Sequence, residues 1–328
     1  MLSNQFANCP PPCACTVNFC YNKSMKNTHL EHPEDAILSG DLSVIDFLTA
    51  RKHKVAIKWD GSPALVWGTC PKTGKFFVGT KSVFNKVKVK INYTHADIER
   101  NHGDGPVAGI LHTALECLPT PHFGYVQGDF IGFGSGSVFK PQLIEYVFKK
   151  TLTDPINVVA HTHYEGDFSN PSSVFSNPFP EGYHCIIGSP EVSITYPRHQ
   201  YLPLLAKGIA RFAKFPSAKS VAAIKQHCNK FIREKGEFPS ARVMYDSLPS
   251  KYKGEVNVTL FRLYLIVSAI KMRLLNCVND TDSFVECRIM GKPAPHEGFV
   301  LSKGSKVFKL VDRSTFSHLN FTTAKSWK

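Results

Sequence analysis

The segment AIKWDGSP, residues 56–63, places Lys58 between an apolar run and a glycine-containing turn. A lysine that leaves a strand at such a point is partly desolvated, and desolvation together with nearby cations lowers the pKa of an amine. The free amine can then act as a nucleophile. The alternative is structural, because K-x-D-G recurs by chance and a lysine at a strand end is usually a solvated charge.

Four further charged positions follow Lys58 in a fixed order. Lys81 lies in FVGTKS, Asp129 lies in YVQGDF on an expected strand, and Glu297 opens EGFV, with Lys309 twelve residues beyond Glu297. Taken singly, Glu297 could be an ordinary turn carboxylate and Asp129 a solubilising residue at a strand edge. The order in which all of them occur indicates a shared site.

This series resembles the covalent nucleotidyltransferase superfamily of ATP-dependent RNA ligases, DNA ligases and capping enzymes. In that superfamily motif I is K-x-D-G, motif III carries an acidic residue on a strand, motif IV reads E-G followed by two hydrophobic residues, and motif V supplies lysine. The motif sequences are most similar to those of the RNA ligases, which can read K-x-D-G-S, T-K-G-S and E-G-Y-V. They are also similar to those of small phage proteins that share KWDGSPA and FVGTKSVFNK. The resemblance covers residues 25–190 and 285–325.

Two departures from the superfamily pattern stand out. Motif V usually reads K-x-K, but Val307 occupies the first lysine position here, so Lys303 or Lys306 is expected to replace that charge. Motif III usually carries Glu, whereas this chain has Asp129.

The resemblance implies that Lys58 attacks the α-phosphorus of ATP and forms a lysyl-AMP phosphoramidate. Negative charge on the phosphates must be neutralised during this transfer, and Lys309 with Lys303 or Lys306 is the expected clamp. Glu297 is the expected ligand of Mg²⁺ (or Mn²⁺), and Asp129 would hold the ribose or help to place the metal.

Four further residues are expected to line the nucleotide site by the same resemblance. Asp60 and Gly61 belong to motif I, and Lys81 would contact nucleotide hydroxyls or the 5′-phosphate of an acceptor. Tyr164, in HTHYEG, would stack on adenine, although aromatic residues of half-buried strands usually belong to a core.

The activity implied is ATP-dependent polynucleotide ligation, most similar to RNA ligation, in which AMP passes to a 5′-phosphate end and a 3′-hydroxyl then displaces it. A DNA ligase is one alternative; the 19 residues after Lys309 are too few for the OB-fold that DNA ligases and capping enzymes usually append. A second alternative keeps the fold without strand joining and either binds nucleic acid or adenylylates another acceptor.

Charge and composition favour a nucleic-acid partner, with RNA preferred over DNA. The formal net charge is +13, and clustered cations gain affinity by releasing counterions from phosphates; the alternative is that the charge only keeps the chain soluble. Basic residues on the helical segment 201–278 are expected to form a phosphate-contacting surface rather than a merely solvated face, and they are Lys207, Arg211, Lys214, Lys219, Lys225, Lys230, Arg233 and Lys235.

The cysteine pattern and the absence of an opening signal segment predict a reduced, cytoplasmic setting, which would be the host cytoplasm if the chain is virus-encoded. Cys9, Cys13, Cys15 and Cys20 crowd into a Pro-rich stretch that lacks two well-formed Cys-x2-Cys knuckles, so a flexible extension is preferred over a zinc site. No apolar run is long enough to span a membrane. We expect a monomer.

Alternating strand-like runs and later helical periodicity predict an α+β fold. The expected strands are the short runs between residues 55 and 93, GYVQGDFIGF, NVVAHTHY, YHCIIG and the runs 284–290, 298–302 and 307–311, while a helical segment begins near Thr28 and another fills 201–278. We therefore expect a flexible extension over 1–24, a helical insert over 201–284, and a nucleotidyltransferase (ATP-grasp-like ligase adenylation) core of antiparallel sheets over 25–200 and 285–328.

Overall fold

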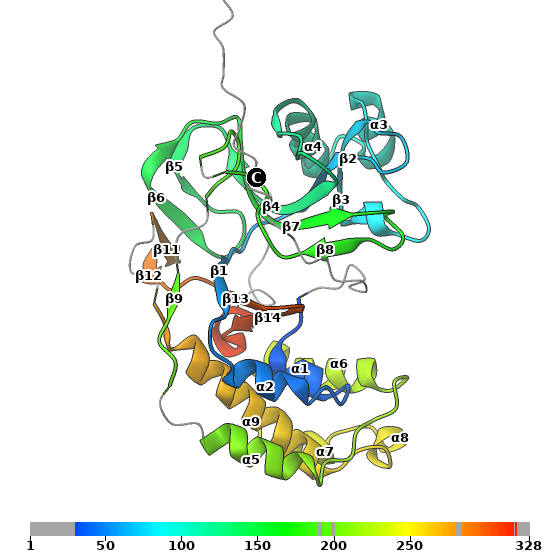
Figure 1. Cartoon of the computed structure of the whole chain (residues 1–328), viewed down its shortest axis with the longest axis vertical. Coiled ribbons are helices and arrows are strands. Elements are labelled where there is room, and N and C mark those ends of the chain that lie inside the picture. Colours follow the sequence, from blue (N-terminus) through cyan, green and yellow to red (C-terminus); the bar gives the residue numbers. More distant parts are fainter. Residues whose placement is uncertain are drawn as a thin grey trace, which may run out of the picture.

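A computed structural model describes residues 30–180, 182–188, 192–197, 201–279, 284–317 and 319. Figure 1 shows the larger sheets at one end, a group of helices at the other, and a small sheet of β1, β13 and β14 between them. The predicted α+β class with antiparallel sheets is confirmed. The N-terminal cysteine cluster lies outside the described residues.

The largest sheet has five antiparallel strands in the order β3-β2-β4-β7-β8. Their bounds are Phe76–Thr80 for β3, Ala64–Thr69 for β2, Tyr125–Phe133 for β4, Ile156–Glu165 for β7 and Ser172–Val174 for β8. The 3₁₀ helix η1, Lys81–Phe84, follows β3 directly.

Two helices cover one face of this sheet, α3 (His95–His102) and α4 (Pro106–Cys117). They share a core with side chains of β2 and β4, including Trp67 and Val126. Because successive side chains of a strand point to opposite faces, Tyr125, Gln127 and Asp129 lie together on the other face. Helices α3 and α4 were not expected from the sequence.

The small sheet contains β1 (Lys54–Lys58), β13 (Gly298–Lys303) and β14 (Lys306–Val311) in the order β1-β13-β14. Its register pairs Lys58 with Gly298 and Val300 with Lys309. The face that carries Leu301, Phe308 and Leu310 packs on the helices. Side chains of the opposite alternation, including those of Lys58 and Lys309, therefore lie on the other face.

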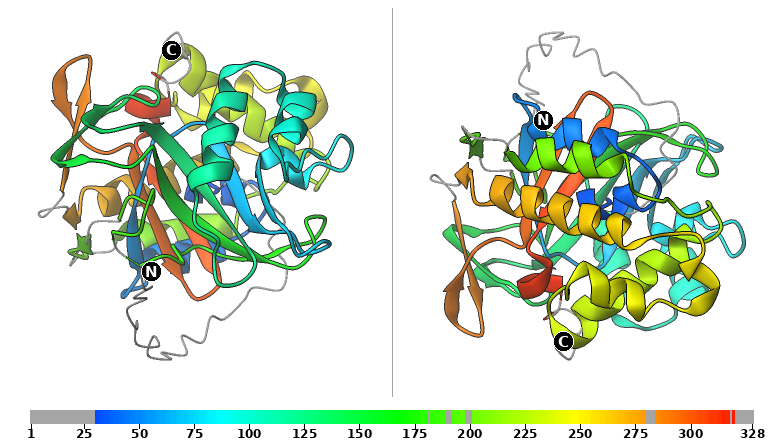
Figure 2. Two further views of the ribbon diagram at one scale, coloured as in Figure 1. Left: turned by 90° about the horizontal axis from the view of Figure 1, so that it is seen from above. Right: turned by 90° about the horizontal axis from the view of Figure 1, so that it is seen from below.

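Helices from two parts of the chain pack under this small sheet as one core. Seen from below, α9 crosses the middle of the group with α5 beside it (Figure 2). The bounds are Pro33–Ile37 for α1, Ser43–Thr49 for α2, Tyr201–Ala210 for α5, Val221–Lys235 for α6, Ala241–Asp246 for α7, Ser250–Lys253 for α8 and Val258–Leu275 for α9. The expected helical insert thus shares its core with α1 and α2 from the other end of the chain.

The remaining strands form a four-stranded sheet of order β12-β11-β6-β5 and the pair β10-β9. Their bounds are Gly136–Phe139 for β5, Glu145–Leu152 for β6, Ser193–Ile194 for β9, Val278–Asn279 for β10, Val285–Ile289 for β11 and Lys292–Ala294 for β12. A short π-helix, η2 (Arg313–Ser317), follows β14.

A buried charged network joins α1 to α9 and η2, and we call it the Glu34 cluster: Glu34, Asp35, Tyr264, Lys271 and Arg313. The Lys271 ammonium lies 2.8 Å from Glu34 Oε1, and these side chains are 1% and 0% exposed. Arg313 contacts Glu34, Asp35 and the Tyr264 hydroxyl. Burial disfavours the charged form of Glu34, but the positive charges of Lys271 and Arg313 hold the pKa of Glu34 below its ordinary value.

Two expected strands are absent from the described residues. Residues 87–93, VKVKINY, form no strand, and only Asn92 makes an isolated bridge, to Val78. Residues 183–188, YHCIIG, contribute one bridge, from Ile186 to Val158. Both segments have strand-like composition, but each forms a single β-bridge to the large sheet and does not extend it. No described helix combines the length and apolarity that crossing a bilayer requires.

Candidate active site

Lys58 ends β1 with its ammonium against the Glu297 carboxylate. The register that pairs Lys58 with Gly298 brings Glu297, the preceding residue, to this position. The two side chains are 24% and 11% exposed, so the pair is largely shielded but open on one side. Residues 239 positions apart in the chain therefore meet because β13 runs antiparallel beside β1.

The Lys58–Glu297 contact sets the protonation of the amine. Burial opposes the charged form of Lys58, but the Glu297 carboxylate, helped by Asp129 and Asp60, raises the pKa of Lys58 above its ordinary value. Burial also raises the pKa of Glu297, while Lys58 opposes that shift. In this state the amine is an ammonium and must lose its proton before it can act as a nucleophile.

Asp129 and Lys81 come from the large sheet and belong to the same electrostatic neighbourhood. Asp129 pairs with Ala64 in the register of β4 and β2, on the face away from α3 and α4. Lys81 begins η1, where burial lowers its pKa, Asp129 opposes that shift and Lys58 adds to it. The small sheet, which contains Lys58, and the large sheet therefore both contribute charged groups to this neighbourhood. We call Lys58, Lys81, Asp129, Glu297 and Lys309 the Lys58 cluster.

Lys309 lies on β14 beside β13, on the same face of the small sheet as Lys58. Burial, reinforced by the positive charge of Lys58, lowers the pKa of Lys309 to about 8. Among the described residues, the Lys309 ammonium has no hydrogen-bond or ion-pair partner. A half-buried lysine of this kind is suited to an incoming anion.

The two glycines of the motifs allow close approach of strands. A Cβ on Gly61 would lie 2.6 Å from the Asp129 Cβ, and one on Gly298 would lie 2.0 Å from the Leu310 carbonyl oxygen. Gly61 therefore brings the turn after Lys58 against Asp129, and Gly298 brings β14 against β13. Their role in this structure is to position neighbouring strands.

Asp60 is a buried anchor of the same turn. Its carboxylate accepts the backbone N–H groups of Leu143 at 3.1 Å and Ile144 at 3.4 Å, and its own N–H donates to the Tyr146 hydroxyl. Burial raises the pKa of Asp60, against the effect of Lys58. The carboxylate was expected at the nucleotide, but it points into the protein and holds the loop before β6.

Lys303 and Lys306 do not join Lys309, in contrast to the expected clamp. Lys303 lies three residues after Val300, and Lys306 lies three residues before Lys309. Because side chains alternate between the two faces of a strand, Lys303 and Lys306 lie on the face opposite to Lys309. Lys303 donates to the Arg51 carbonyl at 2.7 Å, and Lys306 contacts the Ser43 hydroxyl at α2. The second charge of motif V is thus not supplied from these positions.

Tyr164 also departs from its expected place. Its side chain is 4% exposed and belongs to a core with Phe77 and Phe168. The ring stacks on Tyr125 with centroids 5.4 Å apart, and the hydroxyl donates to Gln127 Oε1. Since the ring is buried against Tyr125 and the hydroxyl bonds within the core, the residue is a packing element and not an exposed platform for a base.

His161 is a neighbour of Asp129 that lies outside the recognised motifs, and a surface or hydrogen-bonding role was expected for it rather than metal binding. The register passes from Gln127–Thr162 to Gly128–Ala160, which leaves His161 as an extra residue in β7. Such bulges re-aim side chains, and His161 Nε2 lies 3.7 Å from Asp129 Oδ2. No spacing in the sequence announces this bulge.

A second group with metal-binding residue types lies elsewhere and contains none of the expected site residues. Asp154, His184 and Cys185 bring ligand atoms within 4.8 Å of one another. The Asp154 carboxylate already accepts from Cys185 N and pairs with His184 Nδ1. Burial raises the pKa of the Cys185 thiol to about 12, so the group is accounted for by its internal hydrogen bonds.

The basic residues of the helices are partly engaged within the protein. Lys225 pairs with Glu31 at 2.6 Å, and Lys207 pairs with Asp46 at the same distance. Lys230 is 3.6 Å from Glu234. A phosphate-contacting helical surface remains a prediction, and Lys225 contributes less to it because its charge is directed at α1.

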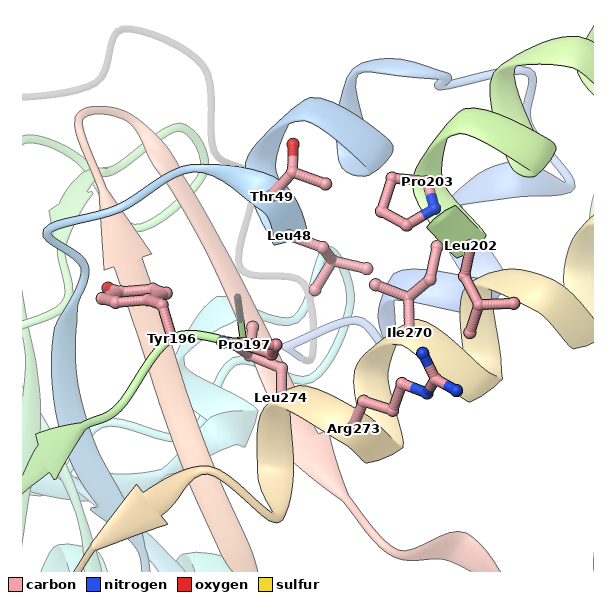
Figure 3. Close-up of a pocket in the computed structure, with 9 residues that line it drawn as sticks. All are labelled: Leu48, Thr49, Tyr196, Pro197, Leu202, Pro203, Ile270, Arg273 and Leu274. Carbon is pink, nitrogen blue, oxygen red and sulfur yellow. The ribbon is translucent and has the colours of Figure 1, made fainter. Parts of the chain in front are cut away.

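An apolar pocket opens within the helical group, away from the expected site residues. Leu48, Leu202, Ile270 and Leu274 line it together with Tyr196 and Pro197 (Figure 3). The Arg273 side chain at its margin stacks on Tyr201 with 4.6 Å between the guanidinium carbon and the ring centroid. The lining carries no group suited to phosphate chemistry other than this engaged arginine.

Comparison with known proteins gives one match. A family model described as "Family of unknown function (DUF6267)" matches residues 27–325. No curated protein and no solved structure matches the chain.

Proposed function

The chain belongs to the DUF6267 family, and because that membership assigns no activity, we propose from the site that it is an ATP-dependent RNA ligase acting through a lysyl-AMP intermediate on Lys58. The observation that carries the proposal is the contact of the Lys58 amine with Glu297, within reach of the charges of Asp129 and Lys309. Lys58, Asp129 and Lys309 come from three different strands, β1, β4 and β14, and Glu297 directly precedes a fourth, β13.

The first step is nucleotidyl transfer to nitrogen. The Lys58 ammonium releases a proton to solvent, and its nitrogen forms a bond to the α-phosphorus of ATP. The bond from that phosphorus to the bridging oxygen of pyrophosphate breaks, and the nitrogen releases a second proton to solvent, which leaves a phosphoramidate N–H. Lys309 and Lys81 supply positive charge for the phosphate oxygens. Such charges stabilise the transition state most effectively in a site from which water is largely excluded. Glu297 is positioned to direct the amine and to accept its hydrogen bond.

Glu297 and Asp129 also fit the expected divalent cation. Both are oxygen donors, which Mg²⁺ prefers, and both act electrostatically on the Lys58 amine. When bound, Mg²⁺ would neutralise phosphate charge. A positive charge near Glu297 would also compete with Lys58 for that carboxylate and so lower the pKa of the amine.

An RNA acceptor is favoured by the motif wording and by the net charge of +13. After AMP passes to the 5′-phosphate, the attack of a 3′-hydroxyl forms the phosphodiester and releases AMP. Among the described residues, β14 is followed by η2, which begins at Arg313.

Sealing assays test this proposal directly. Wild-type protein, Lys58→Ala and Lys303→Ala would be given ATP, Mg²⁺ and matched nicked duplexes with RNA or DNA strands. We expect sealing of RNA ends by the wild type and Lys303→Ala, and none by Lys58→Ala. Sealing of DNA alone would identify a DNA ligase, whereas a lysyl-AMP adduct without any sealing would point to another acceptor.

A further inference from the structure

His32 lies between the Lys58 cluster and the Glu34 cluster. It precedes α1, is 8% exposed, and its Nδ1 is buried without a hydrogen-bond partner. Buried polar atoms are nearly always hydrogen-bonded, so each exception calls for an explanation. The neighbouring α1 residues Glu34 and Asp35 are engaged by Lys271, Arg313 and Tyr264 and do not reach this nitrogen with a hydrogen bond.

The backbone fixes His32 beside Lys309. The N–H of Lys309 donates to the carbonyl of Glu31 at 3.1 Å, so the segment before α1 runs along the free edge of β14. The Lys309 ammonium has no partner among the described residues. The bond from Lys309 to Glu31, the residue before His32, thus brings His32 close to Lys309, whose charge acts on the imidazole.

The charges around the imidazole select the kind of ligand. Burial and four cations, Lys309, Arg313, Lys271 and Lys58, lower the pKa of His32 well below its ordinary value. The imidazole is therefore neutral and can donate one hydrogen bond without adding charge. Glu297 Oε2 contacts Lys58 and Glu34 Oε1 contacts Lys271, while Glu34 Oε2 is buried without a hydrogen-bond partner among the described residues. An anionic oxygen would accept hydrogen bonds from both the Nδ1–H tautomer of His32 and the Lys309 ammonium.

We propose that His32 is a phosphate ligand, whose Nδ1–H donates to a triphosphate oxygen of the bound nucleotide while Lys309 neutralises the adjacent charge. The inference deepens the proposed function and rests on it, because it places the triphosphate at β14 and the segment before α1. It also supplies, from outside the recognised motifs, a second phosphate contact where Lys303 and Lys306 face away.

Binding measurements on three variants identify the atom. His32→Ala removes the donor, His32→Asn keeps an N–H near the position of Nδ1, and His32→Gln places one nearer the position of Nε2. Calorimetry would give the Kd of ATP, inorganic tripolyphosphate and adenosine, with His122→Ala, an exposed histidine, as the control. We expect His32→Ala to weaken ATP and tripolyphosphate about 10- to 100-fold, as for a lost hydrogen bond to a charged group, and to leave adenosine unchanged.

The tripolyphosphate affinity of His32→Asn and His32→Gln shows whether His32 binds phosphate or only packs in the protein. His32→Asn should recover most of the tripolyphosphate affinity and His32→Gln little of it; if His32→Ala does not fold, this pair still carries the test. Equal tripolyphosphate affinity in the wild type and all folded variants would overturn the inference, even where wild-type adenylation of Lys58 succeeds. His32-dependent tripolyphosphate binding without any Lys58 adduct would retain the phosphate site and reject the ligase.

Discussion

The Lys58 cluster and the Glu34 cluster both gather opposite charges next to β14, but they differ in exposure and in pairing. Lys271 and Glu34 are 1% and 0% exposed, and Arg313 completes their network. Lys58 is 24% exposed, and Lys309 has no partner among the described residues. The buried, ion-paired charges of the Glu34 cluster hold helices together. The partly exposed charges of the Lys58 cluster, one of which has no partner in the described part of the chain, can still bind a ligand.

Removing one member of the sealed cluster should produce the largest effect. Lys271→Met leaves Glu34 buried beside Arg313 alone, and we expect the free energy of unfolding to fall by about 3–5 kcal/mol. Urea denaturation measures this change. Lys230→Met, which breaks an exposed pair with Glu234, is the matched control and should cost less than about 1 kcal/mol. Similar losses for both variants would remove the distinction between the clusters.

Removing Lys309 should affect chemistry and leave folding intact. Lys309→Ala deletes a positive charge expected at the phosphates, and the rate of Lys58 adenylation should drop about 100- to 1,000-fold. Lys306→Ala, three residues away on the opposite face, should stay within about threefold of wild type. Single-turnover assays with labelled ATP measure both rates. Equal losses would mean that strand alternation does not decide which lysine serves the site.

The affinity for ATP should depend on pH through Lys309. Its pKa near 8 lies below the ordinary 10.5, so the side chain is charged at pH 7 and mostly neutral at pH 9. ATP favours the charged form, and its Kd should therefore rise about tenfold between these pH values. Lys309→Arg keeps its charge throughout and should flatten this dependence. A wild-type Kd that is constant from pH 7 to 9 would contradict the assignment.

The smallest effect is expected at Tyr164. Tyr164→Phe removes a buried hydroxyl that donates to Gln127, and stability should fall by about 1 kcal/mol. Adenylation should change by less than about twofold because the residue packs in a core. Thermal unfolding and the adenylation assay check the two parts. A large rise in the KM for ATP without loss of stability would restore Tyr164 to the nucleotide site.

The sequence predicted the features that depend on local pattern. The strands around Lys58, Asp129 and Glu297 follow from alternation and β-branched composition, and the helices after residue 200 follow from apolar spacing. Helix α3 was missed, although Thr94 and Asp97 form a capping box at its start that can be read in the sequence. The segment VKVKINY was assigned to a strand because its composition is strand-like, yet it forms a backbone bridge to the sheet only at Asn92.

The features that escaped prediction depend on tertiary contacts. Register decides the face on which Lys303 and Lys306 lie, and register is fixed by the pairing of β1, β13 and β14. The carboxylate of Asp60 turns inward because the loop before β6 offers two N–H groups. His32 approaches Lys309 only because the segment before α1 follows the edge of β14. The nature of the residues was visible in the sequence, but their partners were not.

Peptide mapping of the nucleotide adduct tests the central claim most directly. Wild-type protein would be incubated with ATP and Mg²⁺, digested and sequenced by tandem mass spectrometry. We expect one AMP, linked through an acid-labile phosphoramidate, on the peptide that carries Lys58, and none in Lys58→Arg. The absence of any adduct in folded wild-type protein, or an adduct on another residue that persists in Lys58→Arg, would contradict it.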